Sequence, residues 1–543
     1  MIQSSIEPSP GKEAKAISTL VTAPILVSHP AGWEKANARR LRLLAVAFVA
    51  IGLLWRWTRY FLAFPVWGDE AMLLVNYLTR DFADLFGPID NCQIAPLLYH
   101  AAVLASFRAF GGGELALRLP SFLACVGSML LFWRLARLTL PPLGRTVAVG
   151  IFAVSVWPAT MGALVKPYAF DLFAGVALLV VAVTWLRRPA RLGPLAILAA
   201  IVPFALWASY PAVFVAGGIG VALLPVVWRE RRAWALFVAY AVLLVAAFGS
   251  HVLLVARPHL ASQAGGTSTD VGMAVYWKDA FPPFTGPLAF VRWFVLAHTG
   301  QMAAYPLGSA DGGSALTVLL GLIGVVALWR GSQRALVILV FAVFGLWFAA
   351  SCLHKYPYGA SGRLSQHVAP FYCLLAGLGV AVLVERWSSP ARRWGATLVI
   401  AGLLVAIGLG GTVRDVLRPY RHVVDVGKRS VVDALAARSG DDPILVLQAA
   451  NGVEPVFAWQ LGRRGVRWAD AIDWPEVGRT RSSLWIISCA SVQEEQATIE
   501  DRLSSAGERW RCVERMPTEF RPERDDEPVE SCRVYHFVRV EGP

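Results

Sequence analysis

The sequence predicts an all-α polytopic membrane protein of about eleven spanning helices plus interfacial helices, followed by a small C-terminal α/β domain. The chain of 543 residues is 56% hydrophobic and only 16% charged, whereas soluble domains carry roughly 25% charged residues. Apolar runs recur between residues 41 and 412, and many approach the roughly 20 residues that a helix needs to cross the hydrocarbon layer. From about Val413 onward the composition becomes that of a soluble domain.

The arginines lie in short clusters between the apolar runs. The net charge of +13 is therefore explained by membrane topology rather than by nucleic-acid binding. The clusters are Arg39, Arg40 and Arg42; Arg134, Arg137 and Arg145; Arg187, Arg188 and Arg191; Arg229, Arg231 and Arg232; Arg330 and Arg334; and Arg386, Arg392 and Arg393. The positive-inside rule assigns these connections to the cytoplasm. We therefore expect a multi-pass protein of the inner or plasma membrane, with a cytoplasmic N-terminus, an extracytoplasmic C-terminal domain and no nucleic-acid partner.

This topology fixes the expected spans. They lie near residues 43–64, 118–138, 146–164, 168–186, 192–209, 211–228, 233–255, 313–330, 335–353, 368–385 and 395–412. The apolar stretch 95–110 is short and contains Arg108, so it is predicted to be an interfacial helix. Arg56 and Arg59 fall near the outer end of the first span, where long side chains are expected to snorkel to water.

The chain divides into three predicted regions: a disordered cytoplasmic arm (1–40) without a cleavable signal pattern, a membrane domain (41–412) and an extracytoplasmic α/β domain (413–543). In the last region the pattern predicts strands from Pro443, Ser483 and Cys532, and helices over Ser430–Arg438, Val453–Leu461 and Val492–Ser505. Its cysteines show no metal-ligand spacing. An oxidising compartment would permit one disulfide, for which Cys512 and Cys532 are the preferred pair.

Three connections on the predicted outer side carry most of the polar chemistry. The first, residues 65–117, opens with FPVWGDEAM, and the second spans about residues 257–312. A shorter segment from Leu353, LHKYPYGASGRLSQH, is dense in cations and tyrosines. Connections of such length usually have a function of their own.

These segments resemble the C-type glycosyltransferases that use a polyprenyl-phosphate sugar, a family that includes protein O-mannosyltransferases and the lipid A aminoarabinose transferase. The matching residues are the acidic pair Asp69 and Glu70, the string APLLYH at 95–100 with a single proline where the family has two, RLPS at 118–121, and Lys166 and Asp171 in VKPYAFD. The segment HKYPYGASGRL is similar to the late outer loop that holds the lipid phosphate in this family. The resemblance implies the GT-C fold, a polyprenyl-phosphate-linked sugar as donor, and inversion at the anomeric carbon with Asp69 as base.

The residue types agree with this chemistry independently. Sugar transfer from a phosphate to a hydroxyl needs a base for the incoming proton and cations for the leaving phosphate. Asp69, a few residues past the first span, supplies the carboxylate, and Glu70 assists it or orients the acceptor. Lys166 precedes Pro167, which suits the start of a helix, so the helix N-terminus would add to the anion site. His354, Lys355 and Arg363 would complete the cage, with Tyr168, Tyr356 and Tyr358 as hydrogen-bond donors or stacking rings.

Several alternatives stay open at this point. Asp171 lies one turn inside a predicted span and either has a function or only pairs with Lys166. Lys166 and Arg363 have a second interpretation as interfacial anchors. No cofactor is firmly predicted; the acidic pair leaves a divalent cation open, although no further clustered carboxylates complete a shell. The leading function is transfer of one sugar to an extracytoplasmic glycan, lipid or protein, with membrane lipid as a further partner. A transporter or flippase, and a non-catalytic envelope scaffold, are the two rivals.

Overall fold

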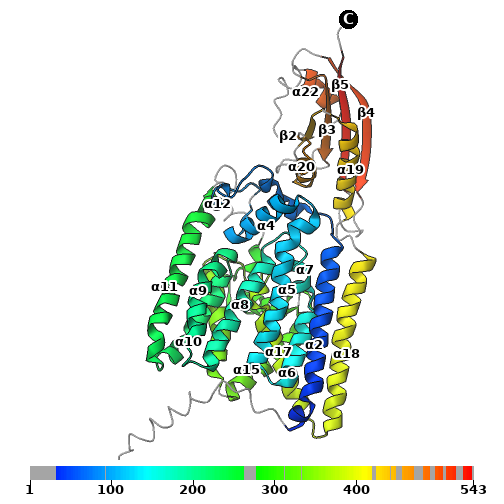
Figure 1. The fold of residues 1–543 in the computed structure, drawn as a ribbon. Helices are drawn as coiled ribbons and strands as arrows, with labels where there is room; N and C mark the ends of the chain where they lie inside the picture. The colour runs from blue at the N-terminus through cyan, green and yellow to red at the C-terminus, as the bar shows by residue number, and fades with distance from the viewer. Residues whose placement is uncertain are drawn as a thin grey trace, which may run out of the picture.

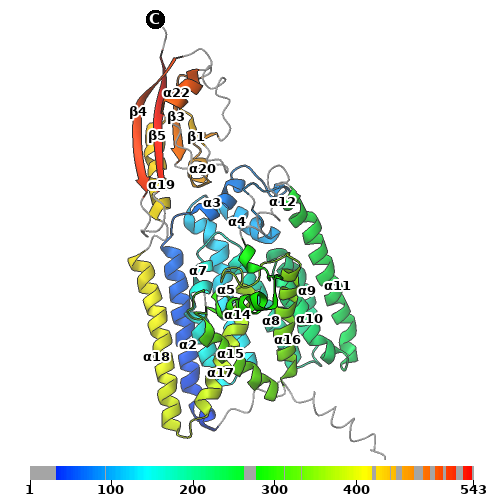
Figure 2. The ribbon, with the colours of Figure 1, turned by 180° about the vertical axis from the view of Figure 1, so that it is seen from behind.

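The protein consists of a bundle of long apolar helices with a small sheet domain at one end (Figure 1). The computed structural model describes residues 32–540 except 92, 262–276, 311, 332, 419–422, 441, 448–454, 467, 470–480, 490–495, 505–508 and 521–529. The predicted arm, residues 1–40, therefore lies largely outside the described residues. The sheet domain stands on the same end of the bundle as the connections that bear α3 and α4 (Figures 1 and 2).

The bundle helices follow the predicted apolar runs. They are α2 (Gly32–Phe61), α5 (Glu114–Thr139), α6 (Pro142–Ala153), α7 (Val156–Met161), α8 (Tyr168–Arg187), α9 (Gly193–Ala208), α10 (Ala212–Val227), α11 (Trp234–His251), α15 (Ala315–Arg330), α16 (Arg334–Cys352), α17 (Ala369–Glu385) and α18 (Pro390–Leu417). Shorter helices in the connections are α3 (Gly68–Leu74), α4 (Leu97–Phe110), α12 (Arg257–Ala261) and α14 (Pro287–Thr299).

Seven segments of the described chain are long and apolar enough to cross a membrane. The shorter apolar helices α6, α9, α10 and α15 coincide with the remaining predicted spans. The helix α4 has 14 residues, so it is about 21 Å long and falls short of the hydrocarbon thickness of about 30 Å. The all-α polytopic membrane class is thus confirmed, while length and composition alone support seven crossings.

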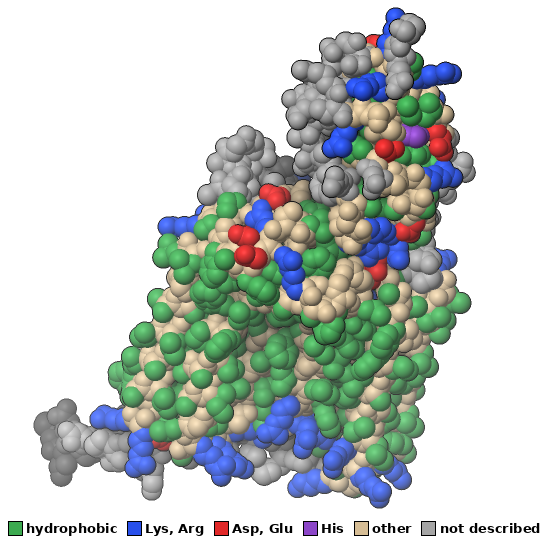
Figure 3. Space-filling model, turned by 45° about the horizontal axis from the view of Figure 1, so that its top comes forward, with side chains coloured by type: hydrophobic (Ala, Val, Ile, Leu, Met, Phe, Trp, Pro, Cys, Tyr) green, Lys and Arg blue, Asp and Glu red, His purple; other side chains and the backbone are tan. Residues whose placement is uncertain are grey.

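Charge is distributed unevenly along the bundle. Figure 3 shows a broad hydrophobic band, with Lys and Arg side chains gathered at the end of the bundle remote from the sheet domain. This basic rim is the feature from which the positive-inside rule predicts a cytoplasmic face. Between the helices, glycines permit close approach: a Cβ at Gly324 of α15 would overlap the backbone of Leu375 in α17. Small residues commonly have this role between membrane helices.

The snorkelling predicted for Arg56 and Arg59 is wrong. Both side chains are buried. Arg56 Nη1 donates to the carbonyl oxygens of Gly52 (2.9 Å) and Ala153 (3.0 Å), the latter at the end of α6. Arg59 pairs with Asp415 of α18 at 2.6 Å, and the same Asp415 oxygen accepts from Trp55 Nε1 at 2.8 Å. Local hydropathy could not reveal Ala153 and Asp415 as partners, because they belong to helices distant in the sequence.

The C-terminal domain contains a five-stranded mixed sheet in the order β2-β1-β3-β5-β4. Its strands are β1 (Ile444–Leu447), β2 (Trp468–Ala469), β3 (Ser483–Cys489), β4 (Arg509–Phe520) and β5 (Glu530–Val540), and its helices are α19 (Val423–Arg438), α20 (Pro455–Gly462) and α22 (Gln496–Ser504). The strand β1 pairs in parallel with β2 and with β3, whereas the pairs β3–β5 and β4–β5 are antiparallel. The three predicted strands and three predicted helices are present. The sequence did not reveal the two-residue strand β2 or the strand β4, whose charged residues and Pro517 weaken the apolar alternation.

The predicted disulfide between Cys512 and Cys532 is wrong. Cys512 is a free cysteine. In the antiparallel β4–β5 ladder Cys512 lies opposite Phe537, whereas Cys532 lies opposite Thr518. Five residues of β5 separate Phe537 from Cys532, which corresponds to about 17 Å of strand. A disulfide needs Cα atoms within about 7 Å, so the strand register prevents this bond.

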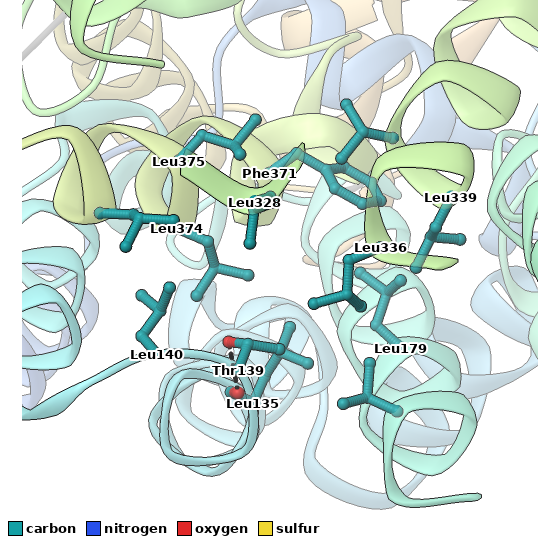
Figure 4. Close-up of a pocket in the computed structure, with 13 residues that line it drawn as sticks. Leu135, Thr139, Leu140, Leu179, Leu328, Leu336, Leu339, Phe371, Leu374 and Leu375 are labelled. Carbon is teal, nitrogen blue, oxygen red and sulfur yellow. Dashed lines mark hydrogen bonds between the residues drawn. The ribbon is translucent and has the colours of Figure 1, made fainter. Parts of the chain in front are cut away.

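An apolar pocket lies among α5, α8, α15, α16 and α17 (Figure 4). Leu135, Leu179, Leu336 and Phe371 are among the lining residues, and Thr139 is the polar member of the set. Thr139 Oγ1 donates to the carbonyl oxygen of Leu135 at 2.9 Å. The lining includes no charged side chain. The charged residues that suit sugar transfer lie instead in the connections near the sheet domain.

Candidate active site

The candidate site begins at the helix α3, which follows the first bundle helix after a short turn. Trp67 precedes α3 in an extended conformation, and Glu70 Oε2 accepts a hydrogen bond from the Trp67 backbone N–H at 3.3 Å. This contact within the first turn stabilises the start of the helix. Asp69 and Glu70 therefore sit at the N-terminus of α3, where the dipole favours negative charge.

The Asp69 carboxylate lies between two cations from distant parts of the chain. Lys166 Nζ is 2.8 Å from Asp69 Oδ1, and Arg363 Nη1 is 3.3 Å from Asp69 Oδ2. The guanidinium of Arg363 also lies over the ring of Trp277, 5.3 Å from its centroid. With side-chain exposures of 28% for Asp69 and 21% for Arg363, this charged centre is within reach of solvent and of a ligand.

Lys166 is the most enclosed member of the centre. It lies between α7 and α8, with a side chain only 7% exposed. Burial lowers the pKa of Lys166, and the neighbouring Asp69 opposes this effect. Its ammonium also donates to Gln93 Oε1 at 2.7 Å. Since an ammonium has three N–H donors, Asp69 and Gln93 leave one for a further oxygen atom.

Glu70 does not share the surroundings of Asp69. It is fully buried, and its oxygens receive Arg118 Nη2 at 2.7 Å and Arg118 Nε at 3.1 Å, in a bidentate pair. The backbone N–H of Val165 donates to Glu70 Oε1 at 2.6 Å. Arg118 also binds the carbonyl oxygens of Phe64 and Pro65. The pair thus ties the start of α3 to α5 and to the residue before Lys166. The carboxylate expected to assist Asp69 or to orient the acceptor is instead enclosed by protein.

Sequence reasoning missed three residues that shape this centre. Gln93 holds the Lys166 ammonium, and no motif singled it out. Arg118 belongs to the RLPS string, which by itself indicates no role for its side chain. Gly362 lies directly against Trp157, so that a Cβ at this position would overlap the indole. The close approach of Gly362 fixes where the next residue, Arg363, enters the site.

The predicted site residues Tyr168, Tyr356 and Asp171 differ in their surroundings. Tyr168 begins α8, two residues after Lys166. Asp171 is buried and accepts a hydrogen bond from Ser209 Oγ at 2.7 Å. The described contacts do not include a pair of Asp171 with Lys166, which was one of the two interpretations. Tyr356 packs against Phe214, with ring centroids 5.5 Å apart. Burial raises the pKa of Tyr356, and Asp171 and Tyr168 add to this effect.

Tyr358 points into an aromatic cluster rather than towards Asp69. Its side chain is 2% exposed, and its hydroxyl lies 3.1 Å from Nε2 of His298 in α14. The ring of Trp347 lies 4.3 Å away, centroid to centroid. Burial raises the pKa of the Tyr358 phenol. This side chain therefore anchors the late connection to α14 and α16.

His354 and Lys355 were expected in the phosphate cage but are exposed at the end of α16. The His354 ring stacks on Phe281, at a centroid distance of 4.9 Å. The described contacts pair neither residue with Asp69, Lys166 or Arg363. Of the predicted cage, the structure brings Lys166 and Arg363 to the carboxylate.

The described residues include no cluster of three or more His, Cys, Asp or Glu side chains that could hold a metal ion. The two carboxylates of the acidic pair have cationic partners instead, Lys166 and Arg363 for Asp69, and Arg118 for Glu70.

A helical membrane bundle with a charged site in the connections at one end, next to a small sheet domain, matches the C-type glycosyltransferase fold. Comparison with solved structures shows this fold. ArnT from Cupriavidus metallidurans matches in the apo state with a TM-score of 0.54 and bound to undecaprenyl phosphate with a TM-score of 0.51. Both matches have 12% sequence identity and cover 90% of this chain and 97% of that chain. No protein-family model and no curated protein sequence matches the chain.

Proposed function

We propose that this protein is a membrane glycosyltransferase that moves one sugar from a polyprenyl-phosphate carrier to an extracytoplasmic glycan, lipid or protein. The observation that carries the proposal is the position of the Asp69 carboxylate between Lys166 and Arg363. Sugar transfer from a phosphate needs a base close to cations that stabilise the leaving group. These three side chains supply both.

In the proposed reaction Asp69 takes the proton of the acceptor hydroxyl while that oxygen attacks the anomeric carbon. A new glycosidic bond forms, and the bond between the anomeric carbon and the phosphate oxygen breaks. Its electron pair leaves with the polyprenyl phosphate, which gains one negative charge. Lys166 and Arg363 stabilise that charge. Attack from the side opposite the phosphate inverts the anomeric configuration.

Binding of the donor would also release the base. Lys166 and Arg363 both pair with Asp69, and a phosphate that competes for these cations weakens their hold on the carboxylate. A carboxylate that is less strongly paired is a better proton acceptor. The fold shared with ArnT, which has been crystallised with undecaprenyl phosphate, supports a polyprenyl phosphate as the carrier.

The test uses purified protein in lipid nanodiscs with radiolabelled polyprenyl-phosphate sugars and an extract of envelope acceptors. Transfer of label by the unaltered protein is expected, and Asp69→Asn should reduce it about 10²-fold or more, the range for loss of a general base. Asp90→Asn is the matched control, because Asp90 lies in the same connection in an exposed pair with Arg80. Full transfer by Asp69→Asn would remove the base assignment, and the absence of transfer with every donor would contradict the function.

A further inference from the structure

The C-terminal domain makes direct contact with the helix that carries Asp69. Figure 2 shows α20 next to α3 at the junction of the two domains, and residues of the two helices are in contact although they are distant in the sequence. We infer that α20, chiefly through Trp459, positions Asp69 for the reaction. This inference rests on the proposed function, and it gives the domain a role in the active site itself.

The contact is apolar and fully enclosed. Trp459 and Val456 of α20 are both 0% exposed, and they belong to the same buried cluster as Ala71 and Leu74 of α3. The Trp459 ring also lies 5.7 Å from that of Phe107 in α4, centroid to centroid. A tryptophan that buries its whole side chain between two domains is the type of residue that dominates interface energetics.

The geometry of α3 makes this support necessary. The helix has seven residues, and helices of about two turns are not stable by themselves in water. Ala71 and Leu74 follow Asp69 by two and five residues, which places them about 140–160° around the helix from it. The face of α3 opposite Asp69 therefore rests on the cluster completed by Trp459, so its packing sets the direction of the carboxylate.

A polar contact beside the cluster fixes the domain in place. Arg463, one residue after α20, donates to the carbonyl oxygen of Gly112 at 2.9 Å and lies 3.4 Å from Glu114. Arg429 of α19 reaches the same carboxylate at 3.2 Å. Glu114 begins α5, four residues before Arg118, and residues at this spacing share a helix face. The domain thus holds both α3 and the helix whose Arg118 fixes Glu70.

The test combines hydrogen exchange with steady-state kinetics on the full chain in nanodiscs. Trp459→Ala should raise amide exchange across residues 68–78 and lower kcat by about ten- to a hundredfold, with KM for the donor little changed, because Lys166 and Arg363 remain. Trp459→Phe, which keeps an aromatic ring, should restore most of both properties. Arg438→Ala is the control, because Arg438 pairs with Glu514 inside the sheet domain.

The exchange measurement separates this inference from the proposed function. Unchanged protection of residues 68–78 in Trp459→Ala would overturn the positioning role, even if transfer activity is present. Failure to detect transfer in any variant would contradict the function, while increased exchange would still support the contact. If Trp459→Ala does not fold, Arg463→Ala loosens the same junction from its polar side, and unaltered exchange and kcat in that variant would overturn the inference.

Discussion

Glu70 and Arg118 form a buried bidentate ion pair, with nitrogen to oxygen distances of 2.7 and 3.1 Å. Glu70 is adjacent in sequence to Asp69, yet the two carboxylates have different environments. Consecutive residues of a helix point about 100° apart, so one faces the reachable centre while the other enters the protein. Asp69 is thus the proposed base, whereas Glu70 fixes the helix that carries Asp69.

Glu70→Gln is expected to destabilise the protein, because it leaves the Arg118 guanidinium buried without a charged partner. Loss of one member of a buried pair costs about 3–5 kcal/mol. Asp69→Asn should cost less, because the Asp69 carboxylate and Arg363 are partly exposed and solvent weakens their pair. Thermal unfolding of both variants in the same detergent measures the difference. Equal melting temperatures of the two variants would mean that the Glu70–Arg118 pair does not stabilise the fold.

Donor binding is expected to decline at alkaline pH through Lys166. Burial lowers the pKa of this lysine. A lysine carries its charge below its pKa, so binding of a polyprenyl-phosphate sugar should be full at lower pH and lost as the pH rises through the lowered value. The donor is a phosphodiester whose own charge stays constant over this range. Fluorescence or scintillation binding assays across pH 7–11 would follow the decline.

Lys166→Arg supplies the control for this pH effect. Arginine stays charged throughout the range, so the alkaline decline should disappear or move to higher pH, even if the affinity is lower overall. An unchanged profile in Lys166→Arg would assign the titration to another group.

Gly362→Ala is expected to impair the site by steric overlap. The added Cβ would overlap the Trp157 indole, so either the ring or the segment bearing Arg363 has to move. We expect donor affinity to fall about tenfold or more, since small displacements of binding groups have large effects. Combining Gly362→Ala with Trp157→Ala should recover part of the loss. Additive effects of the two substitutions would show that the overlap is not the cause.

Asp415→Ala tests the polar contact between α2 and α18. The substitution removes the acceptor of both Arg59 and Trp55, and we expect a loss of stability of about 3–5 kcal/mol, measured as a lower melting temperature in detergent. Asp90→Ala, which breaks the exposed pair with Arg80, should change it by less than about 1 kcal/mol. A similarly small loss of stability for Asp415→Ala would show that the buried pair of Arg59 and Asp415 contributes little to the stability of the protein.

Much of the fold could be predicted because the relevant signals are local. A run of about 20 apolar residues defines a span without reference to the rest of the chain, and alternation predicted β1, β3 and β5. The family resemblance and the residue types, rather than these local patterns, singled out Asp69, Lys166 and Arg363 as groups of the proposed chemistry. The similarity of HKYPYGASGRL to the phosphate-holding loop of the family placed His354 and Lys355 with them, whereas both side chains are exposed just after the end of α16.

The sequence by itself determined the membrane class and the helical bundle, since lipid solvation acts on each apolar segment separately. Its residue types and family resemblance predicted Asp69 as a base beside a cage of Lys166, His354, Lys355 and Arg363, without deciding which of these reach the carboxylate. Only the tertiary structure decided that Glu70 is buried on Arg118, 48 residues away, that Arg363 reaches Asp69 across 294 residues, and that α20 supports α3. Electrostatic pairing and side-chain packing depend on distances between atoms in space. Those distances are set by how the helices assemble, which no single segment encodes.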